Sequence, residues 1–461
     1  MRHGFLFVLT LFLLTGLARA GDDPARGLVK LDEAIRAAAS LTLTNHPDAD
    51  DVVVDEHIRI EYRTNGTYTA WNDSVVKILT ERGLRENRTI SLNFLLPYGE
   101  SRLARLEVIK PDGRIVPVNL AEQARVMIDP GQMGANIYNP NDKIYQASVP
   151  ALEVGDLCRA ISVYTGHKSV FPDSWSDLET FEGTSPICRG FYEVIGPSAL
   201  PLIRIALKDP VAGTMTNGVE ERDGMTRHWW SVRDVPRMFE EPAMPAAHTV
   251  VQRLVLSTIP DWEAVSKWYW RISLPHLEAV TPELKARVGE LTAGAMDKGG
   301  KTEAIFRYVS QKIRYMGLTT ETEAPGFEPH DVRVTFENQY GVCRDKAALL
   351  VAMLRIAGLE AYPVLIHVGP KKDTEAPQPY FNHAIVCVIG EDGPVLMDPT
   401  NENTKELLPA YLCNRSYLIA RPGGDTLRVS PPIPADVNLM RISTRGHLDE
   451  NGKLLAESDL T

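Results

Sequence analysis

The sequence predicts an α+β protein in which an N-terminal antiparallel, β-sandwich-like domain precedes a domain that begins with helices and ends with strands. Between residues 51 and 250, apolar and polar residues alternate over short stretches that turn-forming pairs separate. After the proline-rich segment 241–245, apolar residues recur with the helical period. The alternation returns in 381–398, which places strands late in the second domain.

Residues 1–20 have the organisation of a secretory signal peptide. Arg2 gives a positive start, residues 5–17 form an apolar run, and the sequence Ala-Arg-Ala at 18–20 offers small residues for cleavage. The run is shorter than the roughly 20 residues that a spanning helix needs. We therefore expect an exported, periplasmic or extracellular protein that begins near Gly21 and has no integral membrane segment after the signal peptide is removed.

Charge and length restrict the class of protein. The chain has 461 residues and a net charge of −11, and loss of residues 1–20 would leave 47 basic against 60 acidic residues, a net charge of −13. An acidic surface argues against nucleic acid or an anionic membrane as the partner. The length is enough for two or three domains. Nothing in the sequence predicts the oligomeric state.

Five cysteines are present, an odd number for a protein of an oxidising compartment. At least one thiol must be free or pair with another molecule. Cys158 and Cys188 lie in the β-rich region, and we expect them to form a disulfide. A remaining free thiol is either used chemically or is a buried, inert core residue.

Four segments follow the signal peptide. Residues 21–50 form a polar lead-in with one short helix over 28–39, and residues 51–250 form the β-rich domain, which gathers no nucleophile, base and acid together. Residues 255–425 form the second domain. Residues 426–461 begin a C-terminal β segment, because a turn at 449–452 separates two short alternating stretches.

Helix starts are visible in the second domain. Asp261 can cap a helix, Thr281 precedes a proline that suits a first turn, and 302–313 carries one apolar face. The tryptophan cluster at 262–270 is read as packing rather than as a ligand site.

Cys343 stands at the start of a further amphipathic helix. Gly341 permits a tight entry, apolar residues share one face of 343–354, and Gly358 is a natural stop. At a helix N-terminus the unpaired N–H groups and the dipole favour a thiolate. The alternative is that Cys343 is one more apolar residue on the core face.

His383 and Asp398 are predicted to share a face of one hairpin. The strand 381–389 is followed by a four-residue turn, which would place Ile389 opposite Pro394 on the returning strand. Asp398 would then lie one diagonal step from His383, within reach of a side-chain hydrogen bond. A slip by one residue would separate them onto opposite faces. A thiolate, an imidazole that moves its proton and a carboxylate that orients the imidazole form a nucleophilic set.

Three segments together resemble the core motifs of the transglutaminase-like superfamily: Gly-Val-Cys-Arg-Asp-Lys-Ala at 341–347, Phe-Asn-His-Ala-Ile-Val at 381–386 and Met-Asp-Pro-Thr at 397–400. The resemblance covers about 260–425 and implies a papain-type fold. It also implies Cys343 as nucleophile, His383 as base and Asp398 as the orienting acid. The β-rich region more loosely resembles a domain of unknown function that often precedes such domains in exported bacterial proteins.

The sequence is therefore consistent with two functions. The first is a thiol enzyme that attacks protein or peptide amides through a thioester, followed by transfer to an amine or by hydrolysis. The second is a non-catalytic binding or assembly module of the cell envelope. Gln339 lacks the spacing of an oxyanion donor and is read as a solvated loop residue, while Asp345 and Lys346 are read as structural. No zinc-type His/Cys spacing or calcium loop occurs, so we expect no metal and no cofactor.

Overall fold

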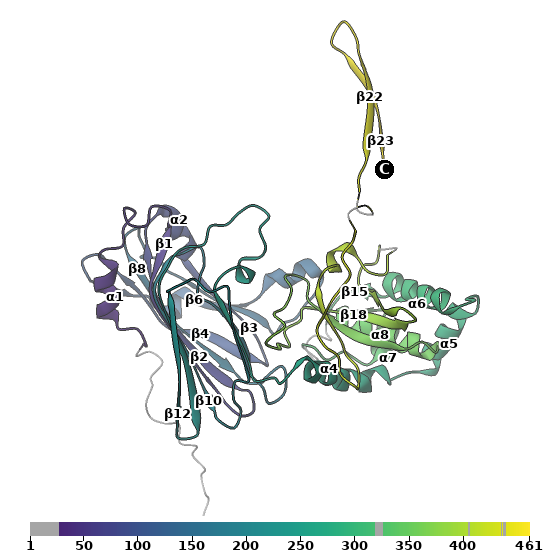
Figure 1. Cartoon of the computed structure of the whole chain (residues 1–461), viewed down its shortest axis with the longest axis horizontal. Coiled ribbons are helices and arrows are strands. Elements are labelled where there is room, and N and C mark those ends of the chain that lie inside the picture. Colours follow the sequence, from purple (N-terminus) through teal and green to yellow (C-terminus); the bar gives the residue numbers. More distant parts are fainter. Residues whose placement is uncertain (1–26, 319–325, 404–405, 435, 437–438) are drawn as a thin grey trace, which may run out of the picture.

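The computed structural model describes residues 27–318, 326–403, 406–434, 436 and 439–461, so the predicted signal peptide lies outside the described residues. A β-rich region and an α+β domain lie side by side, and a C-terminal hairpin extends from the latter (Figure 1). No helix in the described part of the chain is long and apolar enough to cross a membrane.

The β-rich region contains fourteen strands and a few short helices. The strands are β1 (Asp51–Tyr62), β2 (Tyr68–Ile78), β3 (Thr89–Leu95), β4 (Gly99–Ile109), β5 (Ile115–Pro117), β6 (Ala124–Ile128), β7 (Asp142–Ser148), β8 (Leu157–Gly166), β9 (Ser176–Thr180), β10 (Ile187–Pro197), β11 (Arg204–Lys208), β12 (Met215–Arg222), β13 (Met225–Val235) and β14 (Arg253–Ser257). The helices are α1 (Leu31–Ala38), α2 (Glu81–Asn87) and α3 (Leu120–Gln123), with 3-10 turns η2 (Pro130–Ala135) and η3 (Ala247–Thr249).

Eight of these strands form one large sheet, in the order β12-β13-β10-β1-β2-β8-β4-β5. Every neighbouring pair is antiparallel except β1 and β10, which run parallel. A parallel pair needs a long connection. Here the connection between β1 and β10 contains the strands β2 to β9. The expected antiparallel sandwich is therefore present, with one parallel pair at its centre.

Two smaller sheets pack against the large one and close the sandwich. In the sheet β11-β14-β9, Leu254 and Leu256 of β14 join a core with Tyr192 of β10. In the sheet β3-β7-β6, Ala147 of β7 joins a core with Val108 of β4. Alternate apolar side chains from facing sheets produce these cores, as the period-two pattern predicts.

The predicted disulfide between Cys158 and Cys188 is wrong, because both residues are free cysteines. Cys158 lies on β8 and Cys188 on β10, and β1 and β2 separate these strands in the sheet. Three strand spacings amount to about 14 Å. A disulfide requires Cα atoms within about 7 Å. Presence in one domain was thus insufficient grounds for pairing them.

In the residues that the structure describes, the α+β domain contains five α-helices and one main sheet. Its elements are α4 (Trp262–Leu277), α5 (Pro282–Thr292), α6 (Lys298–Lys312), β15 (Arg314–Tyr315), α7 (Val332–Asn338), β16 (Tyr340–Gly341), α8 (Cys343–Ile356), β17 (Ala361–Ile366), β18 (His383–Gly390), β19 (Gly393–Met397), η5 (Ala410–Leu412), β20 (Ser416–Ile419) and β21 (Arg428–Val429). The antiparallel sheet has the order β19-β18-β17-β20-β21. Its last strand lies beyond residue 425.

Helix α8 is the centre of this domain. Its residues from Ala347 to Leu354 are all fully buried, and they share a core with α4, α5, α6 and the strands β17 and β18. The left-handed Gly358, with φ of 81°, follows the helix as the predicted stop. Because the helix is packed on several sides, its first residue is held in a fixed position.

The two parts of the molecule are joined by specific contacts. The Arg253 guanidinium on β14 donates to both carboxylate oxygens of Asp373, at 3.3 and 3.1 Å. The Ser257 hydroxyl donates to the Pro377 carbonyl at 2.6 Å, and the Gln378 amide donates to the Asp177 carbonyl at 2.7 Å. These bonds fix the segment that leads into β18.

The chain ends in an isolated hairpin of β22 (Ile442–Leu448) and β23 (Leu454–Leu460). Every residue of both strands is exposed, and the hairpin projects away from the other elements (Figure 1). This hairpin lies within residues 426–461, for which the sequence predicts a C-terminal β segment.

Candidate active site

Cys343 is the first residue of α8, as predicted, and its position is set by the turn before it. A side chain at Gly341 would place a Cβ 2.7 Å from the Cβ of Asp345, so the tight entry requires glycine. The Asp345 carboxylate accepts hydrogen bonds from the backbone N–H of Val342 at 3.1 Å and of His330 at 3.0 Å. Asp345 therefore anchors the helix start, in agreement with its predicted structural role.

Lys346 fixes the same helix from its other side. Its ammonium is fully buried and donates to the carbonyls of Ser310 at 3.2 Å and Ile313 at 2.5 Å, at the C-terminal end of α6. Carbonyls at a helix C-terminus favour a positive charge. Lys346 is thus a structural residue, as predicted, and it ties α8 to α6.

His383 and Asp398 meet across the hairpin of β18 and β19. The register is the predicted one, with Ile389 opposite Pro394. His383 Nε2 lies 3.1 Å from Asp398 Oδ2, and the carboxylate is fully buried. Since Nε2 bonds to the carboxylate, Nδ1 is the ring nitrogen left for the thiol.

Three further groups hold the Asp398 carboxylate. The Tyr411 hydroxyl donates to Oδ2 at 2.7 Å, while the Thr400 backbone N–H and hydroxyl donate to Oδ1 at 2.9 and 2.8 Å. Burial alone would raise the pKa of Asp398, but the hydrogen bonds and the charge of His383 outweigh it and lower the pKa. Asp398 is therefore ionised and rigidly oriented beside the imidazole.

The charges of Cys343 and His383 depend on each other. Burial alone would raise the pKa of the Cys343 thiol, but hydrogen bonding to His383 and the charges of His383 and Arg344 lower it below the ordinary thiol value. Burial alone would lower the pKa of His383, but hydrogen bonds with Asp398 and Cys343 raise it to about 10. Opposite shifts of this kind favour a thiolate beside an imidazolium.

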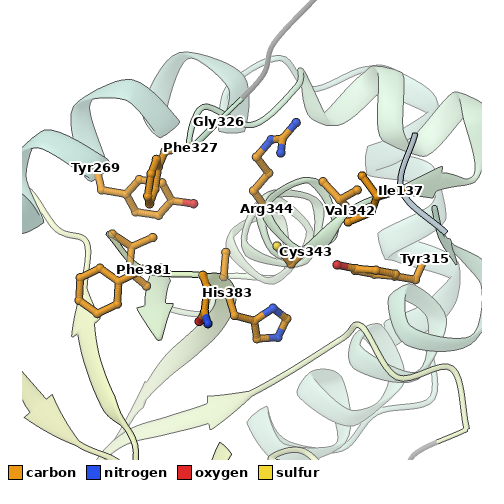
Figure 2. A pocket seen from close by; sticks show the side chains of 13 residues that line it. Ile137, Tyr269, Tyr315, Gly326, Phe327, Val342, Cys343, Arg344, Phe381 and His383 are labelled. Atoms are coloured by element: carbon orange, nitrogen blue, oxygen red, sulfur yellow. The ribbon is translucent and has the colours of Figure 1, made fainter. Parts of the chain in front are cut away.

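A pocket of about 290 Å³ opens at Cys343 and His383 (Figure 2). Its lining is mostly apolar, and the Arg344 side chain adds a positive charge to that of His383. Among the described residues, its walls are Ile137, Tyr269, Tyr315, Gly326, Phe327, Val342, Arg344, Leu365, Phe381, Asn382 and Ala384. A small, concave, apolar site with a few polar groups is typical of ligand binding.

Sequence reasoning missed Tyr315, whose hydroxyl points toward Cys343 (Figure 2). Burial raises the pKa of this hydroxyl, so it stays protonated and can donate a hydrogen bond. Tyr315 is placed by the short parallel pairing of β15 with β16, which directly precedes α8. Gln339 lies outside this pocket, where it ends α7 with a left-handed φ of 58°. It is exposed, in agreement with its prediction as a solvated residue.

The remaining cysteines are unlike Cys343. Burial raises the pKa of Cys158 and Cys387 to about 12 and also raises the pKa of Cys188 and Cys413. Among the residues that the structure describes, no group of three or more His, Cys, Asp or Glu side chains is placed to hold a metal ion.

Comparison with known families divides the chain in two. Residues 64–239 match a domain of unknown function (DUF3857), and residues 285–399 match the transglutaminase-like superfamily. No curated protein has a sequence that matches this chain.

Among solved structures, a candidate protease from Parabacteroides distasonis has a similar fold. It is 15% identical, with a TM-score of 0.65, and the match covers 83% of this chain and 72% of that one. A candidate cysteine protease from Cytophaga hutchinsonii (14% identity, 51% and 76% coverage, TM-score 0.23) and an M1 zinc metallopeptidase from Deinococcus radiodurans (12%, 45% and 42%, TM-score 0.25) are only distantly similar. The first comparison shows that the two-part fold occurs in another protein.

Proposed function

Because residues 285–399 form a transglutaminase-like domain, we propose that the protein is a thiol enzyme that attacks protein or peptide amides. Cys343 is the nucleophile, His383 the base and Asp398 the residue that orients the imidazole. The observation that carries the proposal is the buried His383–Asp398 pair beside a helix-start thiol of lowered pKa, inside a pocket. A thiol of this kind is unusual for a core residue, which burial would make less acidic.

The reaction begins with the thiolate–imidazolium pair. The Cys343 sulfur attacks the amide carbon, and the carbonyl oxygen becomes an oxyanion. The His383 imidazolium gives its proton to the amide nitrogen, the C–N bond breaks, and the amine leaves a thioester behind. Water or a second amine then attacks the thioester while His383 takes its proton. Departure of the thiolate restores the starting pair, and the product is an acid or a new amide.

Two donors are available for the oxyanion. The backbone N–H of Cys343 lies at the unpaired end of α8, and the Tyr315 hydroxyl points toward the sulfur. Donors that are fixed before the reaction stabilise the developing charge without reorganisation. We assign to Tyr315 the role of side-chain oxyanion donor, for which the sequence alone gave no candidate.

Labelling with iodoacetamide tests the proposal directly. At a pH about two units below the ordinary thiol pKa of about 8.5, an ordinary cysteine is roughly 1% thiolate. Cys343 should react at least about tenfold faster than the other four cysteines, because its pKa is lowered and theirs are raised. Peptide mapping by mass spectrometry at several times gives the rate for each residue in one sample.

His383→Ala supplies the matched comparison for the labelling. Without the imidazole, burial should dominate, and Cys343 should become as slow as the other buried thiols at this pH. If Cys343 and Cys413 react equally fast in the unmodified protein, the thiol is not activated. The alternative reading as a binding module would then be favoured.

The proposal includes export to the periplasm or the extracellular space. Expression of the full chain in a bacterium should yield a mature protein whose N-terminus is near Gly21, determined by N-terminal sequencing. The matched control replaces two apolar residues of the run, Leu11 and Leu13, with arginine and should leave the precursor uncut. An intact N-terminus in the secreted fraction would contradict signal-peptide cleavage.

A further inference from the structure

One wall of the pocket comes from the β-rich region. Ile137 lies just after η2, between β6 and β7, and its side chain lines the pocket at Cys343. It belongs to the segment that matches the domain of unknown function, whereas Cys343 belongs to the transglutaminase-like segment. The two matched segments therefore share one cavity.

Backbone hydrogen bonds hold Ile137 at this place. The Tyr138 N–H donates to the Gly317 carbonyl at 2.7 Å, and the Gly317 N–H donates to the Asn136 carbonyl at 3.0 Å. These bonds form a parallel bridge between Ile137 and Gly317. Gly317 is two residues from Tyr315, so the same bridge braces the residue whose hydroxyl points toward the sulfur.

The position of Ile137 confines it to one side of the thiol. Figure 2 shows the Cys343 sulfur between Tyr269 and Phe381 on one side and Ile137 with Val342 on the other. A peptide that crosses the pocket must place a residue on each side of the attacked carbon. On this side, Ile137 and Val342 contribute branched aliphatic side chains from the two regions, and Tyr315 lies there with its hydroxyl toward the sulfur.

We infer that Ile137 is a specificity-determining residue, which limits the size of the substrate side chain on its side of the attacked bond. This inference rests on the proposed function and adds a substrate class to it: peptides with a small or medium apolar residue at that position. The β-rich region thereby acts as part of the substrate site. An aliphatic side chain in the wall discriminates by volume, and one methylene in such a pocket changes rates by roughly tenfold or more.

Epoxysuccinyl peptides provide the test, because they alkylate a catalytic thiol and can carry a residue on either side of the attacked carbon. The alkylation rate of Cys343 in the full chain is measured by mass spectrometry for probes with alanine, leucine or tryptophan on each side. Each rate is divided by the iodoacetamide rate of the same variant, which removes any effect on the thiolate itself. Ile137→Ala should raise the tryptophan-to-alanine ratio about tenfold on one side of the probe only.

Two further variants complete the design. Ile137→Trp should shift the same ratio in the opposite direction, by filling the space. Met133→Ala changes an exposed residue of η2 that does not line the pocket, and the ratio should stay as in the unmodified chain.

The outcomes separate the two proposals. In one outcome, iodoacetamide labels Cys343 fast, but the tryptophan-to-alanine ratio is the same in both Ile137 variants as in the unmodified chain. This result would overturn the role of Ile137 but not the proposed thiol enzyme. Fast iodoacetamide labelling without alkylation by any peptide probe would also overturn the role of Ile137, because the pocket would then exclude peptides. Slow iodoacetamide labelling of Cys343 would overturn the proposed function and this inference together.

Discussion

Replacement of Cys343 by alanine is expected to reduce amide turnover by on the order of a million-fold, because a nucleophile that acts as part of a unit has no substitute. The fold should persist. Cys343 is half-buried at the start of α8, and loss of its sulfur should cost about 1 kcal/mol of the free energy of unfolding. Release of a fluorogenic amine from a peptide measures the first effect, and denaturant unfolding measures the second.

Cys188→Ala is the matched control for this experiment. Cys188 is also a half-buried, free thiol, but it lies on β10 in the β-rich region and away from the pocket. Its removal should leave turnover unchanged. If Cys343→Ala unfolds the protein or retains turnover, Cys343 is a packing residue and the enzyme reading fails.

Asp398→Asn should lower turnover by roughly ten-thousand-fold. Asparagine can offer its N–H₂ to His383 Nε2, which would force the imidazole proton onto the nitrogen that faces the thiol. The imidazolium would also lose the carboxylate that helps to raise the pKa of His383 to about 10. In the unmodified protein, turnover should rise as Cys343 ionises and fall again as His383 loses its proton near pH 10. The falling limb should move to lower pH in the variant.

Tyr411→Phe separates orientation from charge at the same carboxylate. The variant removes one hydrogen bond to Asp398 but keeps the negative charge, the bond to His383 and both bonds from Thr400. A loss of about tenfold is expected. If both variants lose turnover equally, removal of the carboxylate charge costs no more than removal of one hydrogen bond. The Asp398 carboxylate would then have only a structural role.

The parts of the site that were predicted from the sequence are those that local pattern determines. The helical period and Gly341 predicted that α8 begins near Cys343, and the four-residue turn predicted the register that brings His383 to Asp398. The helical period and the turn length both relate residues that lie within about twenty positions of one another in the sequence. The helix caps at Asp261 and Thr281 were found for the same reason.

The parts that were missed depend on contacts between distant segments. Tyr411 reaches Asp398 from the 3-10 turn η5, which has no periodicity to read. Tyr315 is oriented by a two-residue strand, and Ile137 enters the pocket only because two regions pack together. The parallel pairing of β1 and β10 likewise joins strands that are far apart in sequence. No local sequence pattern predicts such contacts.

The bonds that join β9 and β14 to residues 373–378 have a consequence for the cooperativity of the protein. The segment from Asp373 to Gln378 connects β17 to His383, and its side chains and carbonyls are held by Arg253, Ser257 and the Asp177 carbonyl. Separation of the two regions would break these bonds together and release the start of β18. Local opening at the imidazole should thus be coupled to opening of the interface. We therefore expect the two regions to unfold as one unit, although two family matches divide the sequence.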